Sequence, residues 1–336
     1  MRVTWTGGRV SVLRIALIVL PVVALASGCQ ASGAPASGGG TTITVAVVPG
    51  IDNAPLRVAV QDGLFQQHGL KVTLKDVTSL DAVFQALTSG QAQIAAGDYT
   101  NFFYEYSAHA VKLHLIADGY DATSNSVAIL TLPSSGITTP QQLEGQSGAV
   151  AAPPQQLADF SQAVPYNIET LAAEEVLQND GVSPSSVNWT DKYQPGNMIA
   201  ALRNHQVKAI LATEPYIVQA EEKLGAVDVL NASTGVTSGL PMSGYFSLNS
   251  YATANPSAVQ AFQQALDQAQ SDCAQRGPVQ TVLPNLTGMS AQDAALVTLG
   301  TYPTSLNVSQ VERVAQLMYD SGMIATPINM NRLTSG

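Results

Sequence analysis

A pattern of strands alternating with helices runs along this chain twice, and it restricts the fold more than any other feature of the sequence. Residues 42–48 form a nearly continuous β-branched run that ends at Pro49-Gly50, as is typical of a buried strand. Strand-like and helix-like segments then alternate as far as residue 132. A second round begins at residue 148, and the C-terminal third is helical. The pattern predicts an α/β protein with two lobes.

The two rounds also predict where the chain passes between the lobes. Strands are expected at residues 42–48, 71–77, 93–96, 113–118, 127–132, 148–152, 187–192, 209–212 and 243–248. Helices are expected at residues 54–67, 79–89, 99–108, 166–179, 197–205, 214–224, 255–275, 290–298 and 309–321. We place lobe I at residues 43–132 and 246–336 and lobe II at residues 133–245, with crossings at 130–136 and 240–246. Because ligands of open α/β sheets bind at the carboxyl ends of strands, we expect a ligand cleft between the lobes that closes by hinge motion.

The N-terminus has the pattern of a secretory signal. Three arginines precede the apolar residues 15–25, and small residues follow in the run Ala26-Ser27-Gly28-Cys29. The apolar run is too short to span a bilayer, which takes about 20 residues. The run resembles the lipobox of bacterial lipoproteins, with Ala26 where Leu is usual; the alternative is ordinary signal cleavage beside a chance cysteine.

We therefore expect residues 1–28 to be a signal peptide and Cys29 to be lipidated. Residues 29–42 are rich in Gly, Ser and Ala, which predicts a flexible linker. The protein would then be secreted and anchored by lipid to the outer face of the bacterial cell membrane.

Charge excludes two classes of partner. The chain has 14 Lys and Arg against 24 Asp and Glu, a net charge of −10 at pH 7. Binding to nucleic acid or directly to an anionic membrane surface needs the opposite balance. The second cysteine, Cys273, shares one predicted helical face with Val259, Phe262, Leu266 and Ala269, which predicts a core thiol; a reactive thiol is the alternative.

Several segments, in order along the chain, resemble the substrate-binding proteins of ABC transporters. Residues 47–72 resemble the opening of the nitrate, sulfonate, taurine and thiamine-pyrimidine-precursor group, which has the type 2 periplasmic-binding fold. Residues 87–95, 137–146 and 198–209, followed by Glu214-Pro215-Tyr216, resemble later motifs of the group, although Gln93, His205 and Lys208 depart from its usual residues. The resemblance covers about residues 43–325. It implies a monomeric solute receptor without a cofactor, whose partners are a small-molecule ligand and an ABC permease with its ATPase.

The resemblance also implies that ligand contacts come from the loops after strands. The candidate ligand-binding residues are Asp52, Asn53, Asp98, Tyr99, Thr100, Asp121, Ser124, Tyr166, Asn167, Glu214 and Tyr216. Asp98 and Thr100 could instead cap a helix, and Glu214 could stabilise a helix N-terminus. Tyr99 is the best candidate for stacking on a ligand, although some aromatic side chains of residues 99–106 must lie in the core.

The candidate loops are acidic and aromatic and contain no Arg. This favours a cationic or neutral nitrogenous ligand, such as an amine, a pyrimidine or a thiamine-like compound; a sulfonate or nitrate is the alternative. We expect no catalytic residue and no metal site, because no nucleophile motif or metal-ligand spacing occurs. Two other classes stay open: an enzyme of pyrimidine or cofactor biosynthesis on the same fold, and a ligand-sensing receptor without transport.

Overall fold

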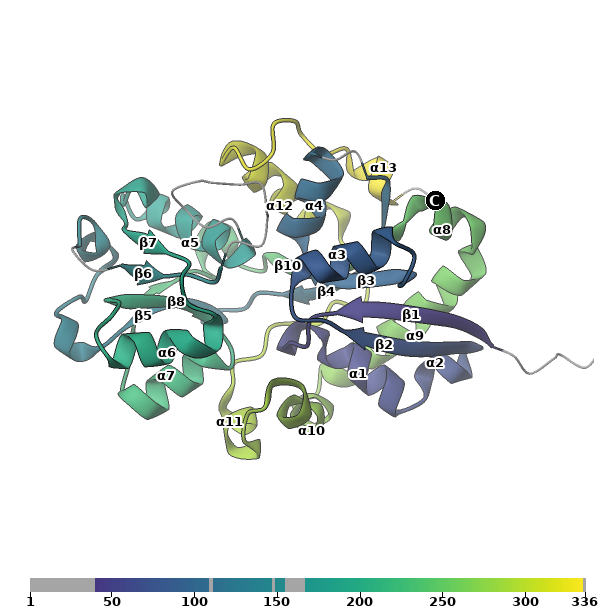
Figure 1. Ribbon diagram of the computed structural model, residues 1–336, viewed down its shortest axis with the longest axis horizontal. Coiled ribbons are helices and arrows are strands. Elements are labelled where there is room, and N and C mark those ends of the chain that lie inside the picture. Colours follow the sequence, from purple (N-terminus) through teal and green to yellow (C-terminus); the bar gives the residue numbers. More distant parts are fainter. Residues whose placement is uncertain (1–39, 109–110, 147–148, 155–166, 335–336) are drawn as a thin grey trace, which may run out of the picture. The chain divides into compact units, whose positions relative to one another are not determined.

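The computed structural model describes residues 40–108, 111–146, 149–154 and 167–334, and residues 40–336 form one compact unit (Figure 1). The predicted signal peptide, Cys29, most of the predicted linker and Tyr166 lie outside the described residues. Within the described ranges, no helix is both long and apolar enough to span a bilayer.

Ten strands form two five-stranded sheets among the described residues. The first sheet has the order β2-β1-β3-β10-β4, and the second has the order β7-β6-β8-β5-β9. The strands of the first sheet are β1 (Thr41–Val47), β2 (Leu70–Asp76), β3 (Ile94–Asp98), β4 (Leu113–Asp121) and β10 (Pro241–Leu248). Those of the second are β5 (Val127–Thr131), β6 (Val150–Ala151), β7 (Trp189–Thr190), β8 (Ala209–Thr213) and β9 (Val227–Asn231).

The two sheets share one plan. In each, three neighbouring strands are parallel, and the fourth strand in the order is antiparallel to both of its neighbours. That fourth strand is β10 in the first sheet and β5 in the second. The α/β class is as predicted, and both sheets are mixed, with parallel and antiparallel pairs.

The crossings differ from the predicted ones. Strand β5 pairs with β8 and β9 in the second sheet, so the chain leaves the first sheet between Asp121 and Val127 and not at residues 130–136. All of β10 pairs in the first sheet, so the chain returns between Asn231 and Pro241. The predicted lobe boundaries therefore shift to these two connections. The sequence of a buried apolar strand does not show which of two sheets it joins, and the predicted crossings were wrong for that reason.

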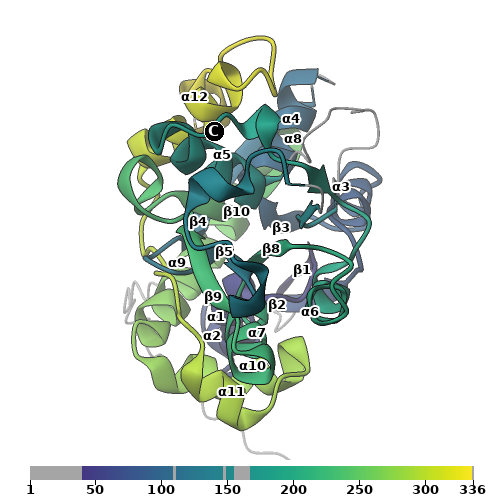
Figure 2. The same ribbon diagram turned by 90° about the vertical axis from the view of Figure 1, so that its left-hand side faces the viewer.

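Helices cover both faces of each sheet. On the first sheet, α1 (Ala54–Gln61), α2 (Leu64–Gln67) and α9 (Pro256–Cys273) pack on one face, and α3 (Leu80–Thr88), α4 (Tyr99–Ala108) and α12 (Val308–Asp320) pack on the other (Figures 1 and 2). On the second sheet, α5 (Ile168–Asn179) packs opposite α6 (Pro195–Arg203) and α7 (Tyr216–Leu224). The remaining helices are α8 (Asn249–Ala254), α10 (Arg276–Thr287), α11 (Ala291–Leu296) and α13 (Met330–Thr334).

Alternation along the strands explains the two-sided core. In β1, Ile43 and Val45 belong to the cluster with Phe262 of α9, whereas Ala46 belongs to the cluster with Phe102 of α4. Successive side chains of a strand point to opposite faces, so a strand buried on both faces reads as a continuous apolar run. Cys273 is 3% exposed within this core, so its prediction as a core thiol is confirmed.

Some elements were not predicted. The expected helix at residues 54–67 is divided into α1 and α2 at Gly63, whose φ of 70° is left-handed. Strand β9 and helices α8, α10 and α13 were missed. Helix α10 contains Pro278 and Pro284. Proline normally argues against a helix, so the sequence did not predict α10.

Candidate functional site

A cavity of about 370 Å³ lies where the carboxyl ends of β1, β3 and β8 meet the N-termini of α5, α6 and α7. This is the edge of an open α/β sheet at which ligands bind. The residues that line it, drawn from both sheets, are Val48, Pro49, Gly50, Ile51, Asp52, Leu80, Ala96, Gly97, Asp98, Tyr120, Ser126, Val127, Ile168, Glu169, Pro195, Thr213, Glu214, Pro215, Tyr216, Met242, Ser243, Leu286 and Thr287.

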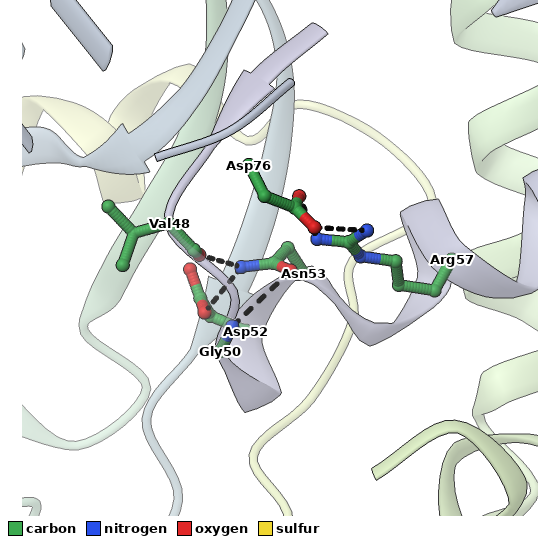
Figure 3. Close-up of polar contacts among 6 residues, drawn as sticks. All are labelled: Val48, Gly50, Asp52, Asn53, Arg57 and Asp76. Carbon is green, nitrogen blue, oxygen red and sulfur yellow. Dashed lines mark hydrogen bonds and ion pairs between the residues drawn. The ribbon is translucent and has the colours of Figure 1, made fainter. Parts of the chain in front are cut away.

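Asn53 holds the loop that presents Asp52 to the cavity (Figure 3). The Asn53 Nδ2 donates to the Val48 carbonyl at 2.8 Å and to Asp52 Oδ1 at 3.1 Å, and the Asn53 Oδ1 accepts from the Gly50 amide at 3.4 Å. Asn53 is 2% exposed and does not line the cavity. Of this predicted pair, Asp52 is therefore placed for contact with a ligand and Asn53 for support.

Three carboxyl groups, Asp52, Asp98 and Glu169, influence one another in this cavity. Burial raises the pKa of Asp98 well above its ordinary value, and the neighbouring carboxylates of Glu169 and Asp52 raise it further. Burial and then the charge of Asp52 raise the pKa of Glu169 to about 7. Burial also raises the pKa of Asp52, although hydrogen bonds from Ser243 and Asn53 oppose the shift. A cation bound among the three groups would favour their ionised forms.

Glu214 has a different role, because both of its carboxylate oxygens are already used. Its Oε2 accepts from the Val218 amide in the first turn of α7 at 3.2 Å. Its Oε1 accepts from the Thr298 amide, after α11, at 2.7 Å. Glu214 lines the cavity but is 6% exposed. These two bonds fit the predicted alternative of a helix stabiliser, and Glu214 as a ligand contact stays a prediction.

Two tyrosines and a methionine give the cavity an aromatic and apolar wall. Tyr216, at the start of α7, is half-buried, and Tyr120 and Met242 are nearly fully buried. The Tyr120 hydroxyl accepts from the Gly300 amide at 2.6 Å. Tyr216 is therefore the predicted aromatic candidate that faces the cavity with an accessible ring.

The described lining contains four carboxylates and no Lys, Arg or His. Arg57 of α1 lies near the Asp52 loop in sequence, but its Nη1 donates to Asp76 Oδ2 at 3.2 Å and it does not line the cavity (Figure 3). Among the described residues, no cluster of His, Cys, Asp and Glu is placed to hold a metal ion.

Tyr99, the predicted stacking residue, is a core residue instead. Its side chain is 0% exposed, packs against Phe103 and Phe246, and donates its hydroxyl to Asp118 Oδ1 at 2.9 Å. Thr100 is likewise buried, and neither lines the cavity. Asp98, the residue before it, lines the cavity, whereas the Tyr99 ring lies among the aromatic side chains of the core.

Three other candidates do not line the cavity and make hydrogen bonds within the fold. Asn167 caps α5: its Oδ1 accepts from the Thr170 amide at 2.7 Å, and its Nδ2 donates to the Pro153 carbonyl at 2.9 Å. Ser124 accepts from Asn231 Nδ2 at 2.9 Å between the sheets. Asp121 pairs through its backbone with Thr301. Of the described candidates, the cavity thus brings together Asp52, Asp98, Glu214 and Tyr216.

Glu169, Ser243 and Met242 line the cavity but were not predicted. Glu169 is two residues after the cap Asn167, in the first turn of α5, where a carboxylate is ordinarily a helix stabiliser. Its position two residues after Asn167, itself a predicted ligand-binding residue, was the one sequence signal that it could reach the cavity. Ser243 and Met242 lie within β10, where strand periodicity carries no sign of a site.

A protein-family model matches residues 37–282, most of the described chain and every strand of both sheets. The chain belongs to the NMT1-like family. The match includes all cavity residues except Leu286 and Thr287. Family membership therefore covers the site as well as the fold.

A curated relative of this NMT1-like chain comes from Brachyspira hyodysenteriae and is named as an ABC transporter periplasmic binding protein. The two are 24% identical over 206 residues, which is 61% of this chain. The aligned part spans 58% of the length of that relative.

Solved structures share the fold of this NMT1-like protein. The periplasmic aliphatic sulphonate binding protein SsuA from Escherichia coli has a TM-score of 0.68 at 16% identity, covering 88% of this chain and 92% of that one. The desulfurization enzyme DszB has a TM-score of 0.66 at 14% identity, covering 88% and 96%. The type 2 periplasmic-binding fold predicted from the sequence is thereby confirmed, and it occurs in both a binding protein and an enzyme.

Proposed function

We propose that this protein is an extracytoplasmic solute receptor of an ABC importer, and that its ligand is a small nitrogenous compound carrying positive charge. The carboxylates of Asp52, Asp98 and Glu169, in a cavity whose described lining has no basic side chain, are the observation that carries the proposal. Family membership and the name of the Brachyspira relative support the receptor class.

Helix geometry argues against an anionic ligand. The N-termini of α5 and α7 face the cavity, and unpaired helix N-termini are natural anion sites. Here Glu169 lies in the first turn of α5, and Glu214 accepts from the first turn of α7. An added sulfonate or nitrate would meet carboxylates at both helix ends. A sulfonate is the alternative ligand, because the sulphonate binding protein SsuA has the same fold. The carboxylates at both helix ends make it the second choice.

Binding would work by closing the two lobes on the ligand. Asp98 ends β3 of the first sheet and Asp52 follows β1 of that sheet, whereas Glu169 and Tyr216 belong to helices that pack on the second. A cation between Asp98 and Glu169, with its apolar body on Tyr216, would replace their mutual repulsion with attraction. The ligand shifts an open–closed equilibrium by its preference for the closed arrangement.

An enzyme on this fold is the other class, and DszB shows that the fold permits it. Three of the four histidines lie in the described part of the chain, and none of those three lines the cavity. Cys273 is in the core and burial raises its pKa to about 12, so it is a poor nucleophile. These positions favour binding without catalysis.

A thermal-shift screen tests the ligand class. Polyamines, thiamine, pyrimidines, sulfonates and nitrate would each be added to the purified protein at millimolar concentration. A ligand with micromolar affinity then stabilises the folded state by about 4 kcal/mol, which is a clear rise in Tm. A rise with cationic compounds alone supports the proposal. A rise with sulfonates or nitrate alone would reject the charge assignment and leave the receptor class standing.

Location and transport need a separate test. We propose that Cys29 carries the lipid anchor, following the lipobox-like run that precedes it. Cys29→Ser should move the protein from the membrane fraction to the soluble extracytoplasmic fraction. Deleting the protein should abolish uptake of the ligand found in the screen, and the lipidated form alone should restore it. Intact uptake after deletion would favour a sensing receptor.

A further inference from the structure

Residues 298–302, between α11 and α12, make hydrogen bonds to both sides of the cavity. At one end, the Thr298 amide donates to Glu214 Oε1 at 2.7 Å, and Glu214 follows β8 of the second sheet. At the other end, Thr301 and Asp121 exchange two backbone hydrogen bonds of 2.9 and 3.0 Å, and Asp121 ends β4 of the first sheet. We call residues 298–302 the strap.

The middle of the strap is tied to the outward crossing and to the cavity wall. The Leu299 carbonyl accepts from Thr123 Oγ1 at 3.0 Å, in the connection between β4 and β5. The Gly300 amide donates to the Tyr120 hydroxyl at 2.6 Å. A Cβ on Gly300 would lie 2.3 Å from the Asp121 carbonyl oxygen, so this close approach requires glycine.

The last residue of the strap bonds to a third residue of the cavity lining. The Tyr302 hydroxyl donates to the Ile51 carbonyl at 2.8 Å, and Ile51 lies beside Asp52 in the cavity lining. The rings of Tyr302 and Tyr120 are 5.3 Å apart between centroids. Three residues bonded by the strap therefore line the cavity: Glu214, Tyr120 and Ile51.

We propose that the strap acts as a third hinge between the lobes, in addition to the two chain crossings. It is attached to the second lobe by hydrogen bonding and not by the chain, and Glu214 is the positioning residue that makes this attachment. Glu214 joins the strap to the first turn of α7, and α11 packs against that same helix (Figure 2). Movement of the second lobe thus pulls on Thr298, and the strap passes the displacement to Asp121, Tyr120 and Ile51. The strap thereby sets the open–closed equilibrium of the proposed receptor, and this role rests on the proposed function.

Two variants remove the attachment from opposite sides. Glu214→Gln exchanges one carboxylate acceptor for an amide donor that cannot pair with a backbone N–H. Thr298→Pro deletes the N–H that donates to Glu214 and leaves the Glu214–Val218 bond in place. Proline is compatible with the preceding residue, because Val297 has φ −52° and ψ 141°. Glu222→Gln, on the exposed surface of α7, is the matched control.

Hydrogen exchange of single amides and small-angle X-ray scattering would be measured on the purified protein without ligand. Both variants should speed exchange of the Asp121 and Thr301 amides, which Glu214 does not touch, by about tenfold. Both should also raise the radius of gyration, whereas Glu222→Gln should change neither. Because both variants act on the same attachment, the double variant should add little to Thr298→Pro alone.

A purely local role gives a different result. If Glu214 only stabilises α7, Glu214→Gln should speed exchange at Val218 while Asp121, Thr301 and the scattering curve stay as in the wild type. Unchanged exchange at Asp121 and Thr301 and an unchanged scattering curve in Thr298→Pro as well would overturn the hinge assignment. Thr298→Pro also decides the question should Glu214→Gln fail to fold. Since no ligand is used, a failed hinge is distinguishable from a failed receptor assignment.

Discussion

The Tyr99 hydroxyl donates to Asp118 Oδ1 at 2.9 Å, and both residues are buried in the first lobe. The bond joins the start of α4 to β4 across β10. Burial raises the pKa of Asp118 to about 6, and the bond from Tyr99 opposes that rise, so Tyr99 stabilises the ionised carboxylate. This pair is part of the core on which the cavity rests.

Removing that hydroxyl should lower stability without altering the cavity. Tyr99→Phe keeps the ring against Phe246 but removes one of the two donors to Asp118 Oδ1, the other being the Gly119 amide at 3.1 Å, and we expect a loss of about 1–3 kcal/mol in the free energy of unfolding. Urea denaturation measures it. Tyr106→Phe, on the half-buried part of the same helix, is the control and should change little. Equal stability of Tyr99→Phe and wild type would show that the bond from Tyr99 contributes nothing to stability.

The ring of Tyr99 also requires a glycine opposite it. A Cβ on Gly244 in β10 would lie 2.8 Å from the Tyr99 ring, closer than real Cβ contacts. Gly244→Ala should therefore displace the ring and destabilise the protein by about 1–3 kcal/mol, as overpacking does. Gly196→Ala is the matched control, because its Cβ would lie 3.9 Å from Tyr216, at ordinary contact distance. Similar thermal melting of the two variants would contradict this packing.

Sequence periodicity predicted most elements because apolar runs and helix caps are local. Ser79, the first residue of the expected helix 79–89, accepts from the Ala82 amide at 3.2 Å as the cap of α3, and α4 has the predicted bounds. Sheet membership is not local: β5 pairs with strands that come about 80 to 100 residues later, and nothing in its five residues shows this. The crossings were misplaced for that reason.

The same limit applies to the cavity. Asp52 and Asp98 could be found because each follows a strand, where the fold rule places ligands. Tyr99 and Asp98 are adjacent in sequence, yet one lies in the core and the other at the cavity. Which of two neighbours reaches the ligand depends on the twist at the end of β3. Residue type and spacing do not contain that information.

Stability should fall as the pH rises from about 5 to 8. Burial, and then the charge of Asp118, raises the pKa of Asp121 to about 8, and Arg313 opposes the shift only in part. Between its ordinary value near 4 and this folded value, the folded state holds a proton that the unfolded state has lost. The free energy of unfolding therefore decreases with pH, by at most about 1.4 kcal/mol per pH unit for one proton.

Asp121→Asn tests the assignment, since asparagine keeps the shape and removes the titration. The variant should match wild type at pH 5 and exceed it at pH 8 in urea denaturation. Asp62→Asn, at an exposed carboxylate, serves as the control. The same pH slope in Asp121→Asn and wild type would assign the dependence to other buried carboxyl groups.

Cys273 should be inert in the folded protein. It is 3% exposed in α9, and burial raises the pKa of its thiol to about 12. Iodoacetamide at neutral pH should leave the Cys273 peptide unmodified in the native protein and alkylate it in denaturant, as read by mass spectrometry. Rapid native alkylation would revive the reactive-thiol alternative and show that α9 opens locally.

Glu169 is the carboxylate through which the second lobe would recognise a ligand cation, so its charge should control affinity. Glu169→Gln keeps the shape of the side chain, and we expect it to weaken binding of thiamine or a polyamine, whichever raises Tm in the screen, by at least tenfold. Glu175→Gln, on the same helix but outside the cavity lining, should bind as wild type does.

The affinity should also depend on pH. Because the pKa of Glu169 is about 7, protonation competes with the cation, so wild-type affinity should rise between pH 6 and 8. The Glu169→Gln variant should lose most of that rise. Titration calorimetry at both pH values measures both effects. Unchanged affinity in Glu169→Gln would mean that the ligand is held from the first lobe alone, by Asp52 and Asp98.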